Sequence, residues 1–458
     1  MRHTKFALAA MALAVLAGCG GTDPAPGNQT LKNKFSAQVS FGDSLSDVGS
    51  YAVGTVAALK GGKFTINGDS SATVSTLTGK NWTELMAAQI GVAAPCPAIT
   101  GLDGNAAQGF SVPQVAHAGC YGYAQGGARV TNPVGPGNKL TGSPLGALTI
   151  PVVTQVANHL KAVGGKFKGD ELVLVMAGGN DVLFNLSKLS ADATAAGTAA
   201  GGQAYVTSLV GQLAAGATNP QTAAQAIGLA AGTEAARPGS TQTTITQAAI
   251  GAAAIQPGNS AVASPAVYGP MVAKATTDAT AAGAKAGADY ATAHGPDLVA
   301  AMTTAGTELA TLVKTQIVAN GANFVTVNNL PDVATTPSGR GQSASTQALI
   351  NAMVSAFNTA LTTGLSSETK VLIVDVFAAS HDQATNPGPY GLTNVSETAC
   401  DLTPAKNPLA SSLVCNASNV KSGDISHWSF ADDVHPTPFT NLLLARYVAE
   451  KLVVKGWL

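Results

Sequence analysis

A short apolar run that stops on glycine is the feature that most constrains the fold of this chain. Glu171–Met176 carries Leu-Val-Leu-Val-Met without a break, and Gly178-Gly179 follows almost at once. An apolar run of this length, bounded by turn residues, is typical of a strand buried on both faces. Such strands belong to parallel sheets covered by helices on both sides. The run therefore predicts an α/β domain.

Other strands and helices alternate along the chain around this run. The expected strands are Ser36–Phe41, Phe324–Val327 and Val371–Val376, and the expected helices are Lys80–Ile90, Pro151–Val163, Asp297–Asn320, Ala344–Gly364 and Pro438 to about Val454. This alternation predicts a doubly wound, mostly parallel sheet flanked by helices. Ligands of such sheets bind beyond the carboxyl ends of the strands.

The stretch 185–294 interrupts the alternation. It consists almost entirely of Ala, Gly, Thr, Gln and Ser, with few charged or aromatic residues. It is too long to be an ordinary loop, and its low charge is not typical of a disordered segment. We predict a helical or partly ordered insert in a domain that spans 35–458, and we expect this insert to form an apolar cap.

The N-terminus has the pattern of an export signal. A basic start is followed by the apolar stretch Phe6–Leu16, which is too short to cross a membrane. The sequence Leu16-Ala17-Gly18-Cys19 resembles a bacterial lipobox, which predicts a signal peptide at 1–18 and a lipid on Cys19. The alternative is an ordinary secretory signal that leaves Cys19 unmodified.

A lipidated Cys19 predicts a protein held at the cell envelope. Several acyl chains anchor a protein firmly, because each buried methylene contributes about 0.8 kcal/mol. Gly20, rather than Asp, follows the cysteine, which in the lipoprotein pattern implies the outer membrane. Residues 19–34 then form a flexible tether. We expect a monomer whose partner is the membrane.

The remaining cysteines and the low charge narrow the class of protein further. Cys96, Cys120, Cys400 and Cys415 are an even number in an exported chain, which predicts two disulfides. Three pairings are possible; we favour Cys96–Cys120 and Cys400–Cys415, because each brackets a loop rich in Gly, Pro or Asn. Charged residues make up 11% of the chain and the net charge is −1, which argues against a nucleic-acid partner. No cluster suggests a metal, and no cofactor is expected.

Three separated motifs supply the parts of a nucleophilic site. Ser44 follows the first strand and is expected at a strand–turn–helix junction, with Gly42 permitting the tight turn. His435 lies three residues after Asp432 in a turn before the last helix, where it can act as a base oriented by a carboxylate. Asn180, after two glycines, can direct its amide at an oxyanion.

A fourth segment, Tyr123-Ala124-Gln125-Gly126-Gly127-Ala128-Arg129, offers a further oxyanion donor from Gly126 or Gly127. Taken together, the chain resembles the GDSL family of lipases and esterases within the SGNH hydrolase superfamily. The resemblance rests on the segments Gly42-Asp43-Ser44-Leu45-Ser46-Asp47-Val48-Gly49, Ala124-Gln125-Gly126-Gly127-Ala128, Gly179-Asn180-Asp181 and Asp432-Asp433-Val434-His435-Pro436-Thr437. It covers roughly 36–184 and 296–455.

The resemblance implies a three-layer, flavodoxin-like fold and a role for each matched residue. Ser44 would be the nucleophile, His435 the base and Asp432 the acid that orients it. The oxyanion donors would be the Ser44 N–H, a glycine N–H and Asn180. Two positions depart from the family pattern: Gly122 stands where an Asn is usual, and Asp433 where a Gly is usual. The choice of Asp432 therefore depends on its spacing from His435.

Three functions fit these motifs. The first is a lipid-anchored hydrolase that cleaves carboxylic esters through an acyl-enzyme on Ser44, with an ester or lipid as its substrate. An apolar cap formed by the insert over this site would favour acyl or polyester substrates. The second is an acyltransferase or phospholipase that uses the same site, since its reaction would pass through the same acyl-enzyme as that of the hydrolase. The third is a surface-binding lipoprotein on a degenerate hydrolase scaffold, with the insert as its working part. The complete set of Ser, Asn, Asp and His favours an enzyme.

Overall fold

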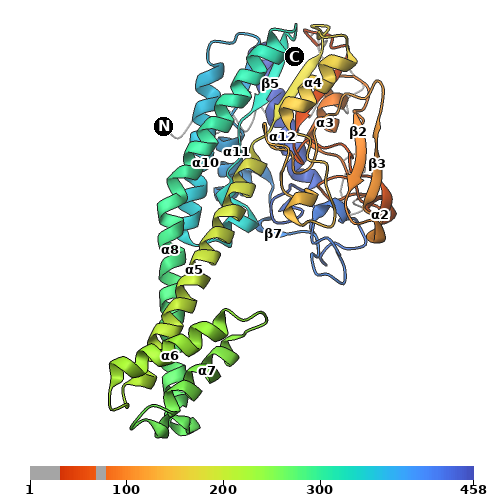
Figure 1. The fold of residues 1–458 in the computed structure, drawn as a ribbon. Coiled ribbons are helices and arrows are strands. Elements are labelled where there is room, and N and C mark those ends of the chain that lie inside the picture. The colour runs from red at the N-terminus through yellow and green to blue at the C-terminus, as the bar shows by residue number, and fades with distance from the viewer. Residues whose placement is uncertain (1–30, 69–78) are drawn as a thin grey trace. The chain divides into compact units, whose positions relative to one another are not determined.

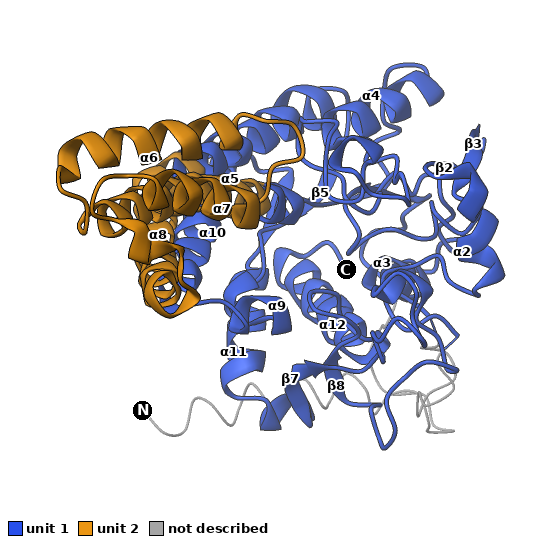
Figure 2. Cartoon of the chain, turned by 60° about the horizontal axis from the view of Figure 1, so that its bottom comes forward, with its two compact units in different colours: residues 1–184, 299–458 blue, residues 185–298 orange. Residues whose placement is uncertain are grey.

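The computed structural model describes residues 31–68 and 79–458, and the described chain divides into two compact units (Figures 1 and 2). Unit 1 comprises the described residues up to Phe184 together with Val299–Leu458, and unit 2 is Asn185–Leu298. The predicted signal peptide, Cys19 and most of the tether lie outside the described residues. Unit 1 contains every strand of the described structure, whereas unit 2 is helical.

A four-stranded parallel sheet forms the centre of unit 1. Its strands are β1 (Gln38–Gly42), β4 (Leu172–Met176), β5 (Phe324–Asn328) and β6 (Val371–Val374), in the order β1-β4-β5-β6. The predicted strands are all present. The last one ends before Asp375, because the Asp375 side chain accepts the Ala378 N–H and caps the helix that follows.

A single backbone bridge extends the sheet on the free side of β1. Ser40 in β1 donates its N–H to Tyr121 and accepts the Tyr123 N–H, which places Gly122 in a parallel bridge. The chain thus leaves β1 toward Gly122 on one side and returns to β4 on the other. Such a reversal of strand order is where α/β sheets bind their ligands, beyond the carboxyl ends of the strands. Ser44 follows β1 at this point.

Helices cover the sheet. α3 (Trp82–Gln89) and α12 (Pro438–Lys455) pack on Leu172, Leu174 and Met176 of β4 in one apolar cluster. α4 (Val152–Ala162) contacts β1, and α10 (Ala344–Leu365) contacts β6. The prediction of an α/β fold with a mostly parallel sheet flanked by helices is confirmed. The helix predicted at Asp297–Asn320 is the last part of α8 (Pro265–Leu312), continued by the π-helical turn η6 (Val313–Val318).

Smaller elements complete unit 1. They are α2 (Gly54–Ala58), the antiparallel pair β2 (Ile99–Asp103) and β3 (Ser111–Ala116), α9 (Pro337–Arg340), α11 (Val376–Thr385), the parallel pair β7 (Asn394–Thr398) and β8 (Trp428–Phe430), and the 3-10 turns η3 (Ala106–Gln108), η4 (Lys139–Thr141), η7 (Val333–Thr335), η8 (Gly388–Tyr390) and η9 (Ser412–Val414). The two predicted disulfides are present, and they join Cys96 to Cys120 and Cys400 to Cys415.

Unit 2 contains the Ala-rich insert, and its limits at Asn185 and Leu298 lie close to the predicted 185–294. It is built from most of the long helices α5 (Gly179–Ala214), which begins in unit 1, and α8, which ends in unit 1, and from α6 (Pro220–Ala235), α7 (Gln242–Ala254) and the turn η5 (Ser260–Ala263). Tyr205, Leu209 and Ile227 form its core with alanines. The role of this unit as a cap stays a prediction.

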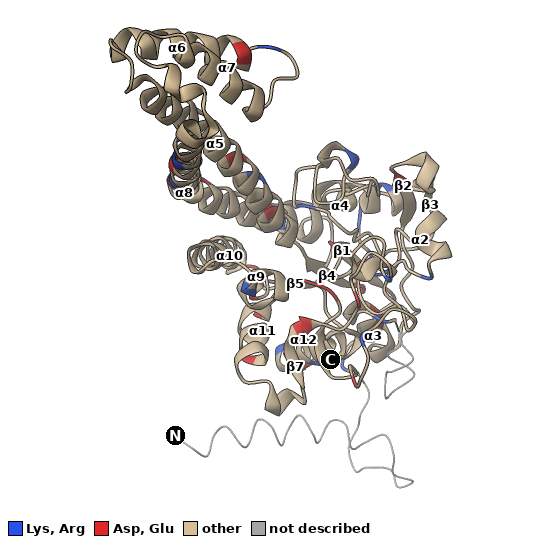
Figure 3. Cartoon of the chain, turned by 90° about the horizontal axis from the view of Figure 1, so that it is seen from below, with Lys and Arg blue, Asp and Glu red and all other residues tan. Residues whose placement is uncertain are grey.

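Charge is sparse over both units (Figure 3). Among the described residues, α10 is the one helix long and apolar enough to cross a membrane by length and composition. Its Met353, Phe357 and Leu361 are fully buried in unit 1. Burial of its apolar side chains is the ordinary state of a core helix, so this helix gives no reason to infer a membrane span.

Candidate active site

Ser44 lies directly beyond the carboxyl end of β1, in a turn that depends on Gly42. Gly42 has a φ of 150°, and a Cβ at this position would collide with the carbonyl oxygen of Met176 in β4. Gln155 of α4 holds the same residue from the other side, accepting the Gly42 N–H and donating to its carbonyl, both at 2.8 Å. The backbone that presents Ser44 is therefore fixed by two neighbouring elements.

The helix predicted to begin at Ser44 is absent, and a tight turn takes its place. Asp47 is the reason. Its carboxylate accepts the N–H groups of Gly49 and Ser50, both at 2.8 Å, and the Gly126 N–H at 2.9 Å. These bonds satisfy backbone donors that a helix would otherwise use, so the chain turns away instead of coiling.

His435 connects Ser44 to Asp432. The His435 Nε2 atom lies 2.8 Å from Ser44 Oγ, although 391 positions separate the two residues. On the other side of the ring, Nδ1 lies 2.8 Å and 2.9 Å from the two carboxylate oxygens of Asp432. Asp433 makes no side-chain hydrogen bond to the ring; its carbonyl accepts the Ser338 N–H. Of the two neighbouring aspartates, the structure brings Asp432 to the histidine.

The protonation states of this pair are set by mutual attraction. Burial works against a charged imidazole, but the Asp432 carboxylate outweighs it and raises the pKa of His435 above its usual value. Burial would likewise raise the pKa of Asp432, but His435 and the hydrogen bonds that Asp432 accepts hold it well below its usual range. Asp432 therefore stays ionised, and His435 can accept a proton from Ser44.

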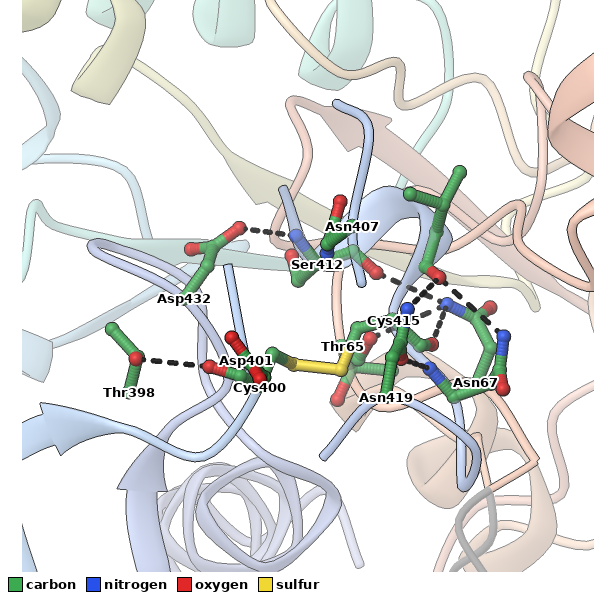
Figure 4. Close-up of a disulfide and its surroundings, with 12 residues drawn as sticks. Thr65, Asn67, Thr398, Cys400, Asp401, Asn407, Ser412, Cys415, Asn419 and Asp432 are labelled. Atoms are coloured by element: carbon green, nitrogen blue, oxygen red, sulfur yellow. Dashed lines mark hydrogen bonds between the residues drawn. A yellow bond between two sulfur atoms is a disulfide. The ribbon is translucent and has the colours of Figure 1, made fainter. Parts of the chain in front are cut away.

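A disulfide-linked segment holds Asp432 in place, as Figure 4 shows. The Ser412 N–H in η9 donates to Asp432 Oδ2 at 2.7 Å, and the His435 N–H donates to Oδ1 at 2.8 Å. Cys415 follows η9 directly and is bonded to Cys400. The Asn67 amide also donates to the carbonyls of Ser412 and Cys415. The disulfide thus restrains the segment that orients the carboxylate.

Asn180 lies in the first turn of α5, beyond the carboxyl end of β4. Its amide donates one hydrogen to the Ala128 carbonyl at 2.9 Å, which leaves the second hydrogen free of a partner among the described residues. The Gly42 carbonyl accepts the Gln125 N–H at 3.1 Å, so the loop with Gly126 and Gly127 runs beside the Ser44 turn. The N-terminus of α5 adds a favourable dipole for negative charge here.

The two glycines of that loop differ in what their N–H groups do. The Gly126 N–H is taken by Asp47, so it is not free to bind an oxyanion. The Gly127 N–H has no acceptor among the described residues, and neither has the Ser44 N–H. Gly127 also requires its lack of a side chain, since its φ is 78° and a Cβ would meet the Pro136 carbonyl. Of the two predicted glycine donors, the geometry favours Gly127.

Three residues at this site were not predicted from the sequence. Asp47 ties the Ser44 turn to the Gly126 loop, as described above. The Phe64 ring packs against His435, with centroids 4.9 Å apart. Arg129 pairs with Asp181 at 2.8 Å and joins the glycine loop to the start of α5. Asp47 and Asp181 each lie within one of the sequence motifs described above, and Phe64 lies in a segment, Gly62–Gly68, that also resembles family members, so their positions were the available signal.

Asp43 adds a second buried carboxyl next to the nucleophile. It is 3% exposed and accepts the Leu45 N–H at 3.1 Å. Burial raises the pKa of Asp43 to about 7, against the opposing effects of the Leu45 N–H and of His435. Its charge in turn contributes to the raised pKa of His435. The two groups therefore influence each other's protonation near neutral pH.

The position of Gly122, where the family pattern has Asn, has a steric explanation. A Cβ on Gly122 would lie 2.6 Å from Val48 Cγ2 and 2.8 Å from the Cys96 carbonyl oxygen. The Cys96–Cys120 loop thus occupies the room that a larger side chain would need, and its hydrogen bonds to Gly122 support the turn instead.

Neither known protein-family models nor curated proteins match this chain. Within residues 31–68 and 79–458, no group of three or more His, Cys, Asp and Glu side chains is arranged to hold a metal ion. The groups that the site brings together beyond the carboxyl ends of the parallel strands are a hydroxyl, an imidazole, a carboxylate and N–H donors that have no acceptor among the described residues.

Proposed function

We propose that this protein is a serine ester hydrolase of the GDSL type, within the SGNH hydrolase superfamily, and that Ser44 forms an acyl-enzyme. The observation that carries the proposal is the hydrogen-bonded series from Ser44 through His435 to Asp432, with both links at 2.8 Å. A serine hydroxyl becomes a useful nucleophile when a base in hydrogen-bond contact takes its proton.

In the acylation step, the Ser44 Oγ–H proton passes to His435 Nε2 while Oγ attacks the ester carbonyl carbon. The carbonyl oxygen becomes an oxyanion, for which the free N–H groups of Ser44 and Gly127 and the Asn180 amide are the donors. The tetrahedral species then expels the alcohol, which leaves with the proton from His435. Asp432 stabilises the imidazolium during this step but does not take its proton.

In the deacylation step, a water molecule replaces the alcohol. His435 takes a proton from the water as its oxygen attacks the acyl carbonyl, and the bond between the acyl carbon and Ser44 Oγ breaks. The proton returns to Ser44, and the carboxylic acid is released. The raised pKa of His435 makes its imidazole a stronger base toward the Ser44 hydroxyl and toward the water.

The same proposal includes the lipid anchor. Its support is the sequence alone: the lipobox-like Leu16-Ala17-Gly18-Cys19 places a lipidated cysteine 25 positions before Ser44. A bacterial outer membrane location follows from Gly20 in the same pattern. A hydrolase tethered in this way would meet esters at or near the membrane surface.

A hydrolysis assay with a matched serine control tests the proposed reaction. With a nitrophenyl ester of a short acid, Ser44→Ala should remove turnover by a factor of roughly 10⁴ or more. Ser40→Ala is the control, since the Ser40 hydroxyl lies buried in β1 without a hydrogen-bond partner among the described residues. Turnover that survives Ser44→Ala at the level of Ser40→Ala would refute the proposal.

A further inference from the structure

A short segment, 63–67, contacts His435 and the residue that follows it. The Phe64 ring packs against the His435 ring, with centroids 4.9 Å apart. The Thr65 hydroxyl donates to the Pro436 carbonyl at 2.9 Å, and Thr65 is fully buried. The segment thus supports both the ring and the backbone of His435.

The Asn67 side chain shapes this segment. Asn67 Oδ1 accepts the Lys63 N–H at 3.0 Å, and its amide nitrogen lies 2.8 Å from the Lys63 carbonyl oxygen and 3.3 Å from that of Thr65. One side chain therefore binds the backbone on both sides of Phe64. Asn67 is 7% exposed, so these bonds are largely shielded from water.

The same amide joins the segment to the loop that holds Asp432. Asn67 Nδ2 lies 3.2 Å from the Ser412 carbonyl oxygen and 3.1 Å from that of Cys415, and the Asn67 N–H donates to the Cys415 carbonyl at 2.8 Å. The Ser412 N–H in turn donates to the Asp432 carboxylate. Figure 4 shows this series of hydrogen bonds from Asn67 through Ser412 to Asp432.

An ion pair fixes the other end of the segment to α3. Lys63 Nζ lies 2.9 Å and 3.0 Å from the two carboxylate oxygens of Glu84, which also accepts the N–H of Asn81, the N-cap of this helix. α3 packs with β4 and α12 in the central apolar cluster of unit 1. The segment is therefore attached to the core of unit 1 at one end and to the Asp432 loop at the other.

We propose that Asn67 is a positioning residue for His435 and Asp432, an inference that rests on the proposed hydrolase function. Its amide holds the Ser412 loop against Asp432, and the turn that it shapes supports His435. Backbone groups occupy its polar atoms, so Asn67 acts through the pair and does not bind the substrate. A misplacement of about 1 Å at a catalytic group lowers the rate by roughly 10²-fold, which is the effect expected when Asn67 is lost.

Asn67 and Asn329 provide a matched pair for the test. Asn329 is also 7% exposed; its amide donates to the Asp375 carboxylate at 2.9 Å, and its Oδ1 accepts the Phe377 N–H at 3.0 Å. Asn67→Asp and Asn329→Asp keep the shape of the side chain but set an oxygen against an acceptor that the amide had bound. Both substitutions should lower the melting temperature, because each leaves a buried polar group unsatisfied. Of the two, only Asn67 contacts the loop that holds Asp432.

The first measurement is kcat and KM for nitrophenyl butyrate, at a temperature at which the proteins are folded. Asn67→Asp should lower kcat by roughly 10²-fold with KM nearly unchanged, whereas Asn329→Asp should change neither by more than about twofold. Thr65→Val removes only the hydroxyl bonded to Pro436 and should lower kcat by roughly tenfold, which decides the question if Asn67→Asp does not fold. Equal kcat values in Asn67→Asp and Asn329→Asp would overturn the inference while leaving the hydrolase proposal intact.

A double substitution separates positioning from a general loss of structure. In the Asp432→Asn background, Asn67→Asp should lower kcat further by less than about tenfold, because residues that act as a unit lose their effects together. A general structural effect would lower kcat by the same factor in both backgrounds, and that result would overturn the inference.

The proton on His435 Nδ1 gives a readout that does not depend on turnover. Because this proton lies between the ring and the Asp432 carboxylate, it should give a low-field resonance in the wild type and in Asn329→Asp. The resonance should broaden in Asn67→Asp and be absent in Asp432→Asn. An unchanged resonance in Asn67→Asp would overturn the inference. The expected resonances in a protein without Ser44-dependent turnover would instead refute the hydrolase function, and with it the catalytic role of the positioning.

Discussion

The two units of this protein differ in how they use polar side chains. In unit 1, buried carboxylates and amides join segments that are far apart in sequence, as Asp47 joins Gly126 and Asp432 joins Ser412. In unit 2, charged residues form exposed pairs one helical turn apart, such as Lys274 with Asp278 and Lys285 with Asp289. Exposed pairs of this kind contribute little to stability.

Unit 2 has a few long-range polar contacts, such as those of the buried Asn259 amide with the Leu213 and Ala253 carbonyls, and it adds close backbone packing to them. A Cβ on Gly197 of α5 would lie 2.7 Å from the Gly283 carbonyl oxygen of α8, and one on Gly283 would lie 2.8 Å from the Gly197 oxygen. Small residues let the two helices approach this closely. These contacts indicate that polar contacts between distant segments organise unit 1, whereas the close approach of helices organises unit 2.

The largest expected effect concerns the polar contacts of unit 1. Asp432→Asn keeps the size of the side chain but removes the charge that orients His435, so turnover should fall by roughly 10⁴. Asp433→Asn, at the adjacent position, should leave turnover near the wild-type value because Asp433 does not contact the ring. Ester hydrolysis by the two purified variants checks this, and equal losses in both would contradict the assignment of Asp432.

A smaller effect is expected from the close packing of unit 2. Gly283→Leu forces a side chain against the Gly197 carbonyl and should lower the free energy of unfolding of unit 2 by about 3 kcal/mol. Gly202→Leu is the control on α5, because Gly202 is exposed and no atom lies within 4 Å of its Cβ position. Urea unfolding followed by circular dichroism measures both.

The two variants show whether close packing of α5 on α8 stabilises unit 2. If the close approach of α5 and α8 determines the stability of unit 2, the Gly202→Leu protein should be as stable as the wild type. Both variants should hydrolyse a short nitrophenyl ester at temperatures at which they are folded. Equal destabilisation by both substitutions would show that the close approach of α5 and α8 is not the source of stability.

The smallest effect is expected from a buried polar side chain in unit 1 that, unlike Asp47 and Asp432, makes no hydrogen bond. His159 is fully buried among Phe41, Tyr121, Tyr123 and Phe167, and neither ring nitrogen has a hydrogen-bond partner among the described residues. Burial lowers the pKa of His159 from 6.5 to about 4. The unfolded chain therefore binds the proton first as the pH falls, so the folded state loses stability between pH 6.5 and pH 4.

Between pH 7 and pH 5, this difference in the pKa of His159 amounts to about 2 kcal/mol. His159→Phe should remove that part of the pH dependence, since Phe has no proton to gain, and should stabilise the protein at pH 5 more than at pH 7. Urea unfolding at the two pH values measures the difference. An unchanged dependence in His159→Phe would show that other groups cause the loss at acid pH.

The parts of the structure that could be predicted share a local signal. The strand at Leu172–Met176 follows from an unbroken apolar run, and the two disulfides follow from cysteines that bracket short loops. Ser44 and His435 were predicted as partners from the order of their motifs along the chain, although the two residues lie far apart in the sequence. The prediction of a helix at Ser44 was wrong, because the Asp47 carboxylate accepts the N–H groups of Gly49 and Ser50 that such a helix would use.

The parts that could not be predicted depend on contacts between distant residues. Nothing in the sequence shows that Ser412 supports Asp432, or that Asp47 takes the Gly126 N–H and leaves that of Gly127 free. In unit 2, composition indicates helices but not their lengths or partners, because Ala and Gly repeat without a distinguishing pattern. The close pair Gly197 and Gly283 is apparent only once the helices are in place.

The proposed reaction depends on Ser44 being a nucleophile that His435 activates. Treatment with a fluorophosphonate, followed by mass mapping of peptides, tests this directly because the reagent bonds covalently to activated serines. We predict one adduct, on Ser44, that is lost in His435→Ala and retained in Ser40→Ala. An adduct on another serine, or ester hydrolysis by a protein whose Ser44 stays unlabelled, would contradict the account.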